Sequence, residues 1–431
     1  MKLAVVGGAS VRTPLLVRGL CRSDLPIAEI ALYDSDQERL PLIAALAREY
    51  AGAAVVTACA SLAQAVEGAD FVVTSIRAGG IEARARDEAA ALARGMVGQE
   101  TVGPAGFAMA MRNIPPLVAC AREVERRAPG AWMVNFTNPV GIVTQALRNE
   151  TSTRVIGICD TPIELFERAA HALGLPAEEC DFDYFGLNHL GWLREVRHRG
   201  EPQLHRLWSD PARLAAVHRG PLFETGALAR LRLLPSEYVF YYDRPGRAVE
   251  NMRRAGASRG EVIRRLNADL FAALAAANGP GRTAYEAYLA ARDGGYMQVE
   301  AGSAAPTAPP PAAGATGYDR IAVDVLRAIH GHAGIVLPLS VPNRGNIPEL
   351  EDGDVVEVPC RIDANGPRPL HVGRVPEAVR GLLLRVKEYE RLTARAAVNR
   401  DPVAALEALA TNPLVPDPAA ARDVFSALDL G

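Results

Sequence analysis

The sequence predicts an α/β protein with a Rossmann-like, doubly wound parallel sheet in its first half and an α+β lobe in its second half. Short apolar runs alternate with segments of helical periodicity as far as residue 160, a pattern typical of βαβ units on a parallel sheet. A Gly-Gly turn follows the first of these runs. The chain of 431 residues also exceeds the usual size of one domain, which indicates a second lobe.

The elements of the first lobe follow the order that such a sheet requires. Residues 2–6 form an apolar run that ends at Gly7-Gly8, and this run predicts a buried parallel strand. Further strands are expected at residues 29–33, 54–59, 71–75, 132–136 and 155–159. Helices are expected at residues 14–22, 37–50, 61–66 and 112–127. We place the first domain at residues 1–185.

The second domain, residues 186–431, is less regular. Helices are expected at residues 261–278, 318–330 and 377–400, and strands at residues 334–341 and 355–359. Residues 302–317 are rich in Ala and Pro and predict an irregular loop. We expect this lobe to complete a substrate site and to mediate assembly into a homodimer or homotetramer.

The composition excludes several classes of protein. A hydrophobic fraction of 49% excludes wholesale disorder, and 47 basic against 50 acidic residues argue against a nucleic-acid-binding protein. The sequence has no apolar run of 18 residues and does not begin like a signal peptide, so no membrane association is expected. Six cysteines without a CxxC pair indicate reduced thiols. Together these features predict a cytoplasmic enzyme.

The N-terminal turn predicts a nucleotide site. Gly7, Gly8 and Ser10 lie between a strand and a helix, where glycines allow backbone amides to approach a pyrophosphate. Asp34 ends the second strand, close to where a carboxylate accepts ribose hydroxyls. The same pattern also fits a glycine turn of any βαβ unit, with Asp34 as a helix cap.

Polar clusters occur where the expected strands end, which is where open α/β sheets bind ligands. These clusters are residues 77–84, 98–101, 135–139, 157–162 and 188–192. The thiolate of Cys159 and the imidazole of His189 are suited to a divalent transition ion in an open site. Taken singly, each residue also fits a structural role, Cys159 as a small core residue and His189 as a satisfied polar group.

The ordered motifs resemble those of the family-4 glycoside hydrolases, the NAD- and metal-dependent 6-phospho-glycosidases. The resemblance spans nearly the whole chain. The motifs that carry it are Gly7-Gly8-Ala9-Ser10 with Thr13-Pro14, Ile76-Arg77-Ala78-Gly79-Gly80, Gly98-Gln99-Glu100-Thr101, Asn135-Phe136-Thr137-Asn138-Pro139-Val140-Gly141, Gly157-Ile158-Cys159-Asp160, Gly186-Leu187-Asn188-His189, Tyr238-Val239-Phe240-Tyr241-Tyr242, Asn343-Arg344-Gly345-Asn346-Ile347-Pro348 and Val355-Val356-Glu357-Val358-Pro359.

The resemblance implies roles for matching residues. It implies that NAD is held by Gly7, Gly8, Ser10, Asp34 and Arg77. It implies that Cys159 and His189 bind Mn²⁺ or another divalent cation. It also implies a phosphorylated disaccharide or aryl glycoside as substrate, bound by Asn138, Asn188, Arg84 and Arg259, with the two arginines on the 6-phosphate.

The implied mechanism is oxidation at carbon 3, elimination, water addition and reduction, so NAD is bound but not consumed. Tyr238 is the expected base for the carbon-2 proton, with Tyr241 and Tyr242 as alternatives; all three tyrosines also fit an apolar strand. Asp160 fits a general acid for the leaving oxygen or a cap of the helix that begins near residue 161.

The expected activity is hydrolysis of 6-phospho-β-glucosides. Asp160 is a feature of the α-glucosidase branch of the family, and Gly294-Gly295-Tyr296-Met297 matches a family motif only in part, so a 6-phospho-α-glucosidase is an alternative. Two further alternatives are a plain NAD-dependent sugar or hydroxy-acid dehydrogenase and a non-catalytic nucleotide sensor.

Overall fold

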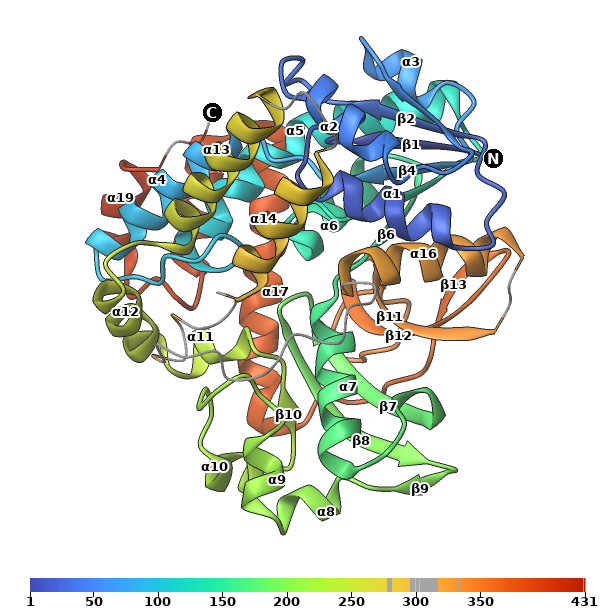
Figure 1. Cartoon of the computed structure of the whole chain (residues 1–431). Helices are drawn as coiled ribbons and strands as arrows, with labels where there is room; N and C mark the ends of the chain where they lie inside the picture. The colour runs from blue at the N-terminus through green and yellow to red at the C-terminus, as the bar shows by residue number, and fades with distance from the viewer. Residues whose placement is uncertain are drawn as a thin grey trace.

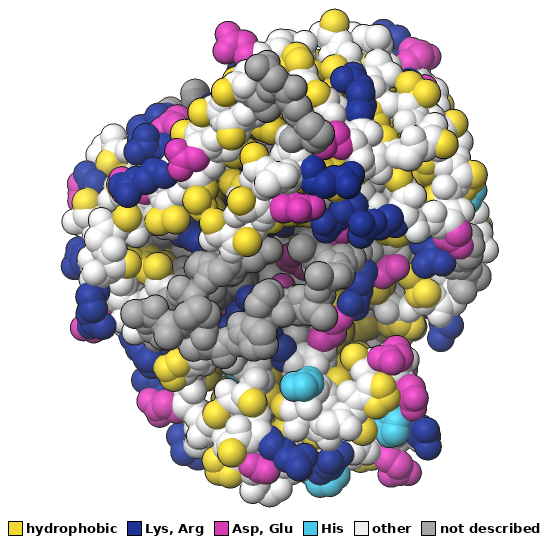
Figure 2. Space-filling view, viewed as in Figure 1, with side chains coloured by type: hydrophobic (Ala, Val, Ile, Leu, Met, Phe, Trp, Pro, Cys, Tyr) yellow, Lys and Arg dark blue, Asp and Glu magenta, His cyan; other side chains and the backbone are white. Residues whose placement is uncertain are grey.

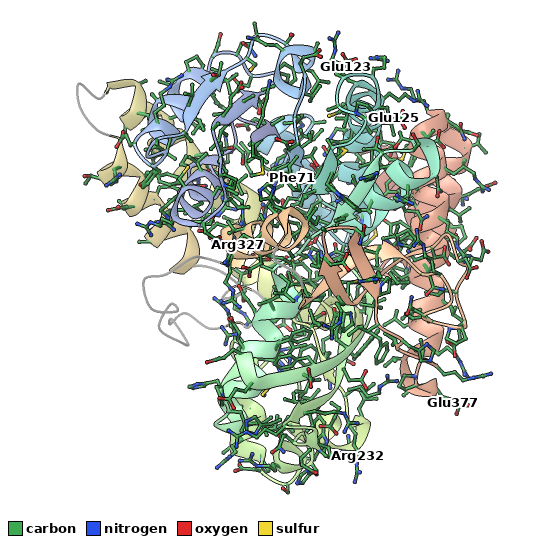
Figure 3. All side chains as sticks on the ribbon, turned by 90° about the vertical axis from the view of Figure 1, so that its right-hand side faces the viewer. Phe71, Glu123, Glu125, Arg232, Arg327 and Glu377 are labelled. Carbon is green, nitrogen blue, oxygen red and sulfur yellow. The ribbon has the colours of Figure 1, made fainter. Side chains whose placement is uncertain are left out.

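The computed structural model describes residues 1–276, 281–294, 299, 302, 317–331, 334–428 and 430. An upper part is built on a large sheet covered by helices, and a lower lobe is built around a small sheet (Figure 1). The view in Figure 3, turned by 90°, shows the lower lobe with Arg232 projecting away from the sheet that contains Phe71. The expected loop at residues 302–317 lies outside the described residues apart from its two end glycines, as do Gly295, Tyr296 and Met297.

The large sheet has nine strands in the order β13-β12-β11-β6-β5-β4-β1-β2-β3. Its strands are β1 (Lys2–Val6), β2 (Glu29–Tyr33), β3 (Val55–Ala58), β4 (Phe71–Thr74), β5 (Trp132–Asn135), β6 (Arg154–Gly157), β11 (Ile335–Pro342), β12 (Val355–Asp363) and β13 (Gly366–Pro369). The first six are parallel in the order β3-β2-β1-β4-β5-β6, which is the Rossmann order. The predicted doubly wound fold is confirmed.

The last three strands of the large sheet come from the second half of the chain. Strand β11 pairs antiparallel with β6 at Ser340 and Gly157, and β12 and β13 extend the sheet beyond it. The division at residue 185 therefore does not follow the sheets: it falls inside β7 (Cys180–Leu187), and the strands expected in a separate second lobe complete the first sheet.

Helices cover the large sheet on both faces (Figure 1). In the first half of the chain these are α1 (Thr13–Arg22), α2 (Leu40–Arg48), α3 (Leu62–Val66), α4 (Gly80–Ala93), α5 (Gly103–Arg127), α6 (Val140–Glu150) and α7 (Thr161–Leu173). Later helices are α13 (Arg259–Ala276), α14 (Arg282–Gly294), α16 (Gly317–His330), α17 (Glu377–Asn399), α18 (Pro402–Thr411) and α19 (Pro418–Phe425). The expected helices agree with these within a few residues, except that α5 begins nine residues before residue 112.

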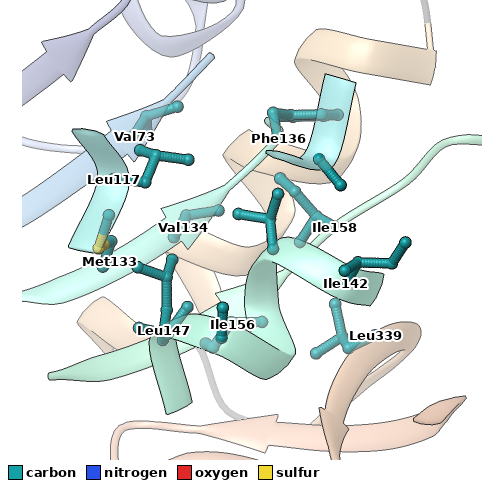
Figure 4. Packing of buried hydrophobic residues seen from close by; sticks show 14 of the residues in the cluster. Val73, Leu117, Met133, Val134, Phe136, Ile142, Leu147, Ile156, Ile158 and Leu339 are labelled. Atoms are coloured by element: carbon teal, nitrogen blue, oxygen red, sulfur yellow. The ribbon is translucent and has the colours of Figure 1, made fainter. Parts of the chain in front are cut away.

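The centre of the core lies between the parallel strands and the helices on each face. Val73, Val134 and Ile156 on three adjacent strands are fully buried, as is Leu339 on β11 (Figure 4). Burial on both faces explains why these strands are apolar runs rather than alternating patterns. This packed sheet gives the strand ends a rigid base for a site.

The lower lobe has a four-stranded antiparallel sheet and short helices. Its strands are β7, β8 (Leu190–His198), β9 (Glu201–Pro202) and β10 (Leu234–Pro235), preceded by the 3-10 turn η1 (Ala177–Glu179). Its helices are α8 (His205–Trp208), α9 (Pro211–Ala215), α10 (Thr225–Leu231), α11 (Val239–Asp243) and α12 (Pro245–Arg254). The tyrosine cluster at residues 238–242 thus lies on the short helix α11, with Tyr238 at its N-cap, and the alternative of an apolar strand is wrong. Within the described residues, no helix is long and apolar enough to cross a membrane.

Candidate active site

One large cavity of about 1240 Å³ opens at the carboxyl ends of the parallel strands, where the upper part meets the lower lobe. Most of the predicted site residues line it: Gly7, Ser10, Asp34, Arg77, Arg84, Asn138, Cys159, Asp160, His189, Tyr238 and Arg259. Gly8 and Asn188 do not line it, contrary to the sequence prediction. The fold therefore brings together residues that are widely separated in the chain.

The N-terminal turn shapes one end of this cavity. Gly7 has φ 95°, and a Cβ there would collide with the carbonyl of Ser75 at the end of β4, so only glycine fits. Gly8 has a packing role instead, because its Cβ would lie 2.9 Å from the Cβ of Leu32 on β2. The two glycines keep the turn close to the neighbouring strands.

The amides of this turn are already bonded within the protein. The N–H groups of Gly7 and Gly8 both donate to Tyr33 O at 2.9 Å, and Ala9 N donates to Asp34 Oδ2 at 3.0 Å. The expectation that the glycine amides themselves bind a pyrophosphate is therefore not met. Ser10 lies in the same turn and lines the cavity, as does the next residue but one, Arg12.

Asp34 faces the cavity from the end of β2. Its Oδ1 accepts a hydrogen bond from Asp36 N at 3.0 Å, and burial raises the pKa of its carboxyl group. Helix α2 begins only at Leu40, and its N-cap residue is Arg39, so Asp34 does not cap it. The helix-cap interpretation is wrong, and the side chain stays at the nucleotide end of the cavity.

Cys159 and His189 meet at the same carboxyl-end edge of the sheet, in another part of the cavity. Cys159 follows β6, whereas His189 lies in the turn between β7 and β8 with φ 62°, a strained value for a non-glycine residue. The Cys159 Sγ lies 3.5 Å from His189 Nε2, and both side chains are buried. The strained turn thus aims the imidazole at the thiol.

This pair fits a shared metal ion. Zinc–sulfur and zinc–nitrogen bonds of about 2.3 and 2.0 Å at a tetrahedral angle place the two ligand atoms about 3.5 Å apart, as observed here. Within the described residues, no group of three or more His, Cys, Asp or Glu side chains is arranged to hold a metal ion. A cation held by these two side chains alone would have an open site, with coordination positions left for ligand oxygens.

The protonation states of the pair respond to burial. Burial lowers the pKa of His189 to about 3, so the imidazole is neutral at pH 7 and able to bind a cation. Burial, together with the negative charges of Asp160 and Glu357, raises the pKa of the Cys159 thiol. A bound cation reverses this second effect, because coordination favours the thiolate.

Tyr238 lies directly against this pair. Its ring stacks on His189 with centroids 3.8 Å apart, and its phenol is within electrostatic reach of the Arg84 guanidinium. Tyr241 also lines the cavity, but Tyr242 does not. Burial, with Tyr389 and Glu390 nearby, raises the pKa of Tyr242 well above its usual value. The geometry thus leaves Tyr238 and Tyr241 within reach of a substrate.

Asp160 occupies the N-cap position of α7, but its side chain makes no capping hydrogen bond. The carboxylate lines the cavity instead, with Oδ1 3.9 Å from Cys159 Sγ. The second interpretation of Asp160, as a helix cap, therefore does not describe its side chain. Its position beside Cys159 suits a group that transfers a proton to a ligand.

Residues 2–175 match the family model "Family 4 glycosyl hydrolase", and residues 184–415 match "Family 4 glycosyl hydrolase C-terminal domain". The chain belongs to glycosyl hydrolase family 4. The resemblance inferred from the ordered motifs is thereby confirmed. A "Probable 6-phospho-beta-glucosidase" of Bacillus subtilis is 31% identical over 99% of this chain and 95% of its own length.

Relatives of both anomeric specificities are similar to this family 4 chain. A phospho-alpha-glucosidase of Clostridium acetobutylicum is 28% identical over 99% of this chain and 96% of its own length. The solved 6-phospho-beta glucosidase of Thermotoga maritima, with manganese, NAD⁺ and glucose-6-phosphate, has a TM-score of 0.83 at 27% identity and covers 99% of this chain and 97% of its own. A lactate dehydrogenase from a deep-sea metagenome shares only the fold, with a TM-score of 0.55 at 13% identity, 92% of this chain and 98% of its own.

One side of the family 4 cavity, called the basic wall below, is lined by Arg77, Arg84, Arg259 and Arg292. Arg77 and Arg84 both pair with Glu100, at 2.5 and 2.8 Å, and Arg84 Nε also donates to Glu88 at 2.8 Å. Burial alone would raise the pKa of Glu100, but the two guanidinium groups outweigh it and lower that pKa to about 2. Arg84 is therefore held by two carboxylates rather than being available as an isolated cation.

One arginine of this wall, Arg292, was not predicted from the sequence. Arg292 on α14 lines the cavity, and its Nη1 donates to the Tyr288 hydroxyl at 2.8 Å. Burial and the like charge of Arg12 lower its pKa, so an anion placed between them is favoured. Arg259 donates to the backbone carbonyl of Arg292 at 2.6 Å and orients this region. Arg292 lies two residues before the partly matched glycine motif at residues 294–297, a nearby signal from which it was not inferred.

Figure 2 shows Lys and Arg side chains gathered on the upper part, above and to the right of the centre of this face. An acidic group also lines the cavity. Glu164, one helical turn after Asp160, pairs with Arg219 at 3.0 Å. Burial and the charge of Asp160 raise the pKa of Glu164 to about 7. No sequence motif singled out Glu164, because a glutamate in the first turn of a helix is common.

The two predicted asparagines, Asn138 and Asn188, have different surroundings. The buried Oδ1 of Asn138 has no hydrogen-bond partner among the described residues, and the residue lines the cavity. A ligand hydroxyl would satisfy this acceptor. The Asn188 side chain points instead to Glu357, whose Oε1 lies 3.1 Å from its Nδ2. Glu357 belongs to a motif that the sequence analysis quoted without assigning a role.

Proposed function

We propose that this family 4 enzyme hydrolyses 6-phospho-β-glucosides with the help of NAD and Mn²⁺ or another divalent cation. The observation that carries the proposal is one cavity lined by the Gly7 turn, the Cys159–His189 pair and Tyr238. A nucleotide turn alone suits a dehydrogenase, but the added thiol–imidazole pair suits a metal-assisted proton abstraction. NAD and manganese accompany the similar Thermotoga maritima enzyme, which supports the same cofactors here.

Each residue of the site has its own role in the proposed reaction. When bound, NAD supplies reversible hydride transfer at carbon 3, and the cation polarises the sugar oxygens. Cys159 and His189 hold the cation, and Tyr238 removes the proton on carbon 2. Asp160 donates a proton to the leaving oxygen, and Asn138 binds a sugar hydroxyl.

We propose that the basic wall binds the 6-phosphate of the sugar. Arg84 and Arg259 line the cavity as expected, and Arg292 faces the like charge of Arg12. Planar guanidinium groups bind phosphate oxygens in pairs, and a phosphate dianion offsets the repulsion between neighbouring arginines. Gly7, Ser10, Asp34 and Arg77 are then assigned to the dinucleotide.

The β specificity is supported by the Bacillus subtilis and Thermotoga maritima relatives, which are 31% and 29% identical. The alternative is a 6-phospho-α-glucosidase, supported by Asp160 and by a Clostridium acetobutylicum relative that is 28% identical. In the α case Asp160 is the acid that protonates the leaving oxygen. In the β case the same role is proposed for Asp160, although an aspartate at this position resembles the α branch of the family.

The decisive experiment is a screen of α- and β-linked nitrophenyl 6-phosphoglucosides with NAD and Mn²⁺. Release of nitrophenol from the β-linked substrate, without net NADH formation, is the expected result. Release from the α-linked substrate alone would assign the alternative specificity. Stoichiometric NADH without nitrophenol would favour the plain dehydrogenase, which shares the fold with lactate dehydrogenase. Light scattering on the same sample tests the proposed homodimer or homotetramer.

A further inference from the structure

Glu357 on β12 is a buried carboxylate that the proposed reaction does not use. Its side chain accepts a hydrogen bond from the Tyr184 hydroxyl at 2.8 Å and another from Asn188 Nδ2 at 3.1 Å. Both donors are neutral, so these bonds satisfy the carboxylate oxygens without offsetting its charge. A buried carboxylate is costly unless something compensates the charge, so its presence here calls for a reason.

The strand register places Glu357 beside the metal-ligand pair. Gly157 on β6 is opposite Ser340 on β11, and Ser340 is opposite Glu357 on β12. Cys159 lies two residues beyond Gly157, and the Glu357 charge reaches its thiol. A side chain from the far end of the sequence is thus held two strands away from Cys159.

The hydrogen bond from Asn188 links Glu357 to His189. Asn188 and His189 are adjacent in the turn between β7 and β8, where His189 has φ 62°. A non-glycine residue keeps such a backbone conformation only when its surroundings hold it. The Asn188 side chain, fixed on β12, supplies one such restraint on the turn that aims His189 at Cys159.

Gly191, the second residue of β8, makes room for the hydrogen bond between Tyr184 and Glu357. Gly191 lies directly beneath Tyr184, and a Cβ at Gly191 would collide with the Tyr184 ring and hydroxyl. The glycine therefore leaves the space through which Tyr184 reaches Glu357. Two of the motifs quoted from the sequence, residues 186–189 and 355–359, meet in this contact between Asn188 and Glu357.

We propose that Glu357 is a positioning residue of the metal site, acting through Asn188 to orient His189 and adding negative charge beside the bound cation. This inference rests on the proposed function, because it requires a metal ion at Cys159 and His189. Carboxylates that orient metal-binding histidines commonly contribute 10- to 100-fold to metal affinity, roughly. The predicted effect is therefore on metal binding rather than on nucleotide binding.

The test compares Co²⁺ and Mn²⁺ binding in the full-length protein and two variants. In Glu357→Gln the amide still accepts from Asn188, and Tyr184 is able to accept from the new NH₂ group, so mainly the charge is lost. In Asn188→Ala the charge stays and the link to the turn is lost. Both variants are expected to bind Mn²⁺ about 10- to 100-fold more weakly, with NAD affinity unchanged.

The matched control is Ser340→Ala, because Ser340 lies between Gly157 and Glu357 without contributing charge or a link to Asn188. It is expected to bind metal like the wild type. Equal weakening in Ser340→Ala would assign the effect to packing and overturn the inference. Wild-type metal affinity in both Glu357→Gln and Asn188→Ala would overturn it as well.

The absorption of bound Co²⁺ separates this inference from the proposed function. A thiolate-to-cobalt band in the wild type is expected, and its absence would remove the metal assignment itself. If the band is present, a changed ligand-field spectrum in Asn188→Ala supports reorientation of His189. An unchanged spectrum with unchanged affinity leaves the metal assignment standing and overturns the role of Glu357.

Discussion

The imidazole ring of His189 lies flat against the phenol ring of Tyr238, with ring centroids 3.8 Å apart and planes 4° from parallel. This contact joins the turn between β7 and β8 to the residue that precedes α11. A proposed metal ligand and a proposed base are therefore held as one unit. Because a change in one ring disturbs the other, metal binding and proton transfer need separate measurements.

Replacement of Cys159 by serine is expected to abolish metal-dependent turnover while leaving NAD binding intact. The thiolate is a stronger ligand for transition ions than a serine hydroxyl, and the dinucleotide end of the cavity lies on other strands. Fluorescence titration with NAD and a Co²⁺ absorption spectrum measure the two properties on one sample. Full activity of Cys159→Ser after chelation of metal would show that the ligand assignment is wrong.

Replacement of Tyr238 by phenylalanine is expected to suppress exchange of the carbon-2 proton with solvent, while the ring keeps its contact with His189. A general base contributes about 10²- to 10⁴-fold to such a step. Deuterium incorporation into a bound substrate, followed by mass spectrometry, measures the exchange. Tyr242→Phe is the matched control, because Tyr242 does not line the cavity. Unchanged exchange in Tyr238→Phe would transfer the role to Tyr241.

Replacement of Arg292 by methionine is expected to weaken glucose 6-phosphate binding more than glucose binding. Hydrogen bonds to charged groups contribute about 1.5–3 kcal/mol, which corresponds to a loss of roughly 10- to 100-fold in affinity. Calorimetric titration with both sugars measures the difference. Arg264→Met is a suitable control, since Arg264 pairs with Glu82 outside the cavity. Equal weakening for both sugars would argue against a phosphate contact.

The pairing of Glu100 with Arg77 and Arg84 predicts a loss of stability in acid. Because the folded protein lowers the pKa of Glu100 from 4.5 to about 2, its stabilising contribution is present above pH 4.5 and is lost as the pH falls towards 2. The full contribution is on the order of 3 kcal/mol. Unfolding free energies of the wild type and Glu100→Gln should therefore converge in this range. The variant Glu201→Gln, at an exposed residue of β9, serves as a control. Parallel pH profiles for Glu100→Gln and wild type would contradict the prediction.

Replacement of Lys387, which does not line the cavity, is expected to lower the free energy of unfolding strongly. Its ammonium group is fully buried in α17, where it pairs with Glu390 and donates to Val355 O at 2.7 Å. Removing one partner of a buried ion pair costs about 3–5 kcal/mol. Lys387→Met should therefore lower the unfolding free energy in urea by that amount. The double variant with Glu390→Gln should recover much of the loss, and equal stability of the single variant and wild type would contradict the prediction.

The sequence by itself determined the parallel half of the fold and the family. Apolar runs of strand length and helical periodicity are local properties, so the six parallel strands were predicted within a few residues. The ordered motifs also singled out Cys159, His189 and Tyr238 as candidate site residues, because each motif lies at the end of an element. These predictions needed no knowledge of which distant segments meet.

The tertiary structure decided what depends on contacts between distant segments. Strands β11–β13 join the first sheet, and Glu357 meets Asn188 although they are 169 residues apart in the chain. Pairing between strands depends on backbone hydrogen bonds that any sequence makes, so a local pattern does not specify the partner strand. For the same reason, the neighbouring groups, rather than residue type, decided that Arg84 is held by Glu88 and Glu100, whereas Arg292 donates to the Tyr288 hydroxyl.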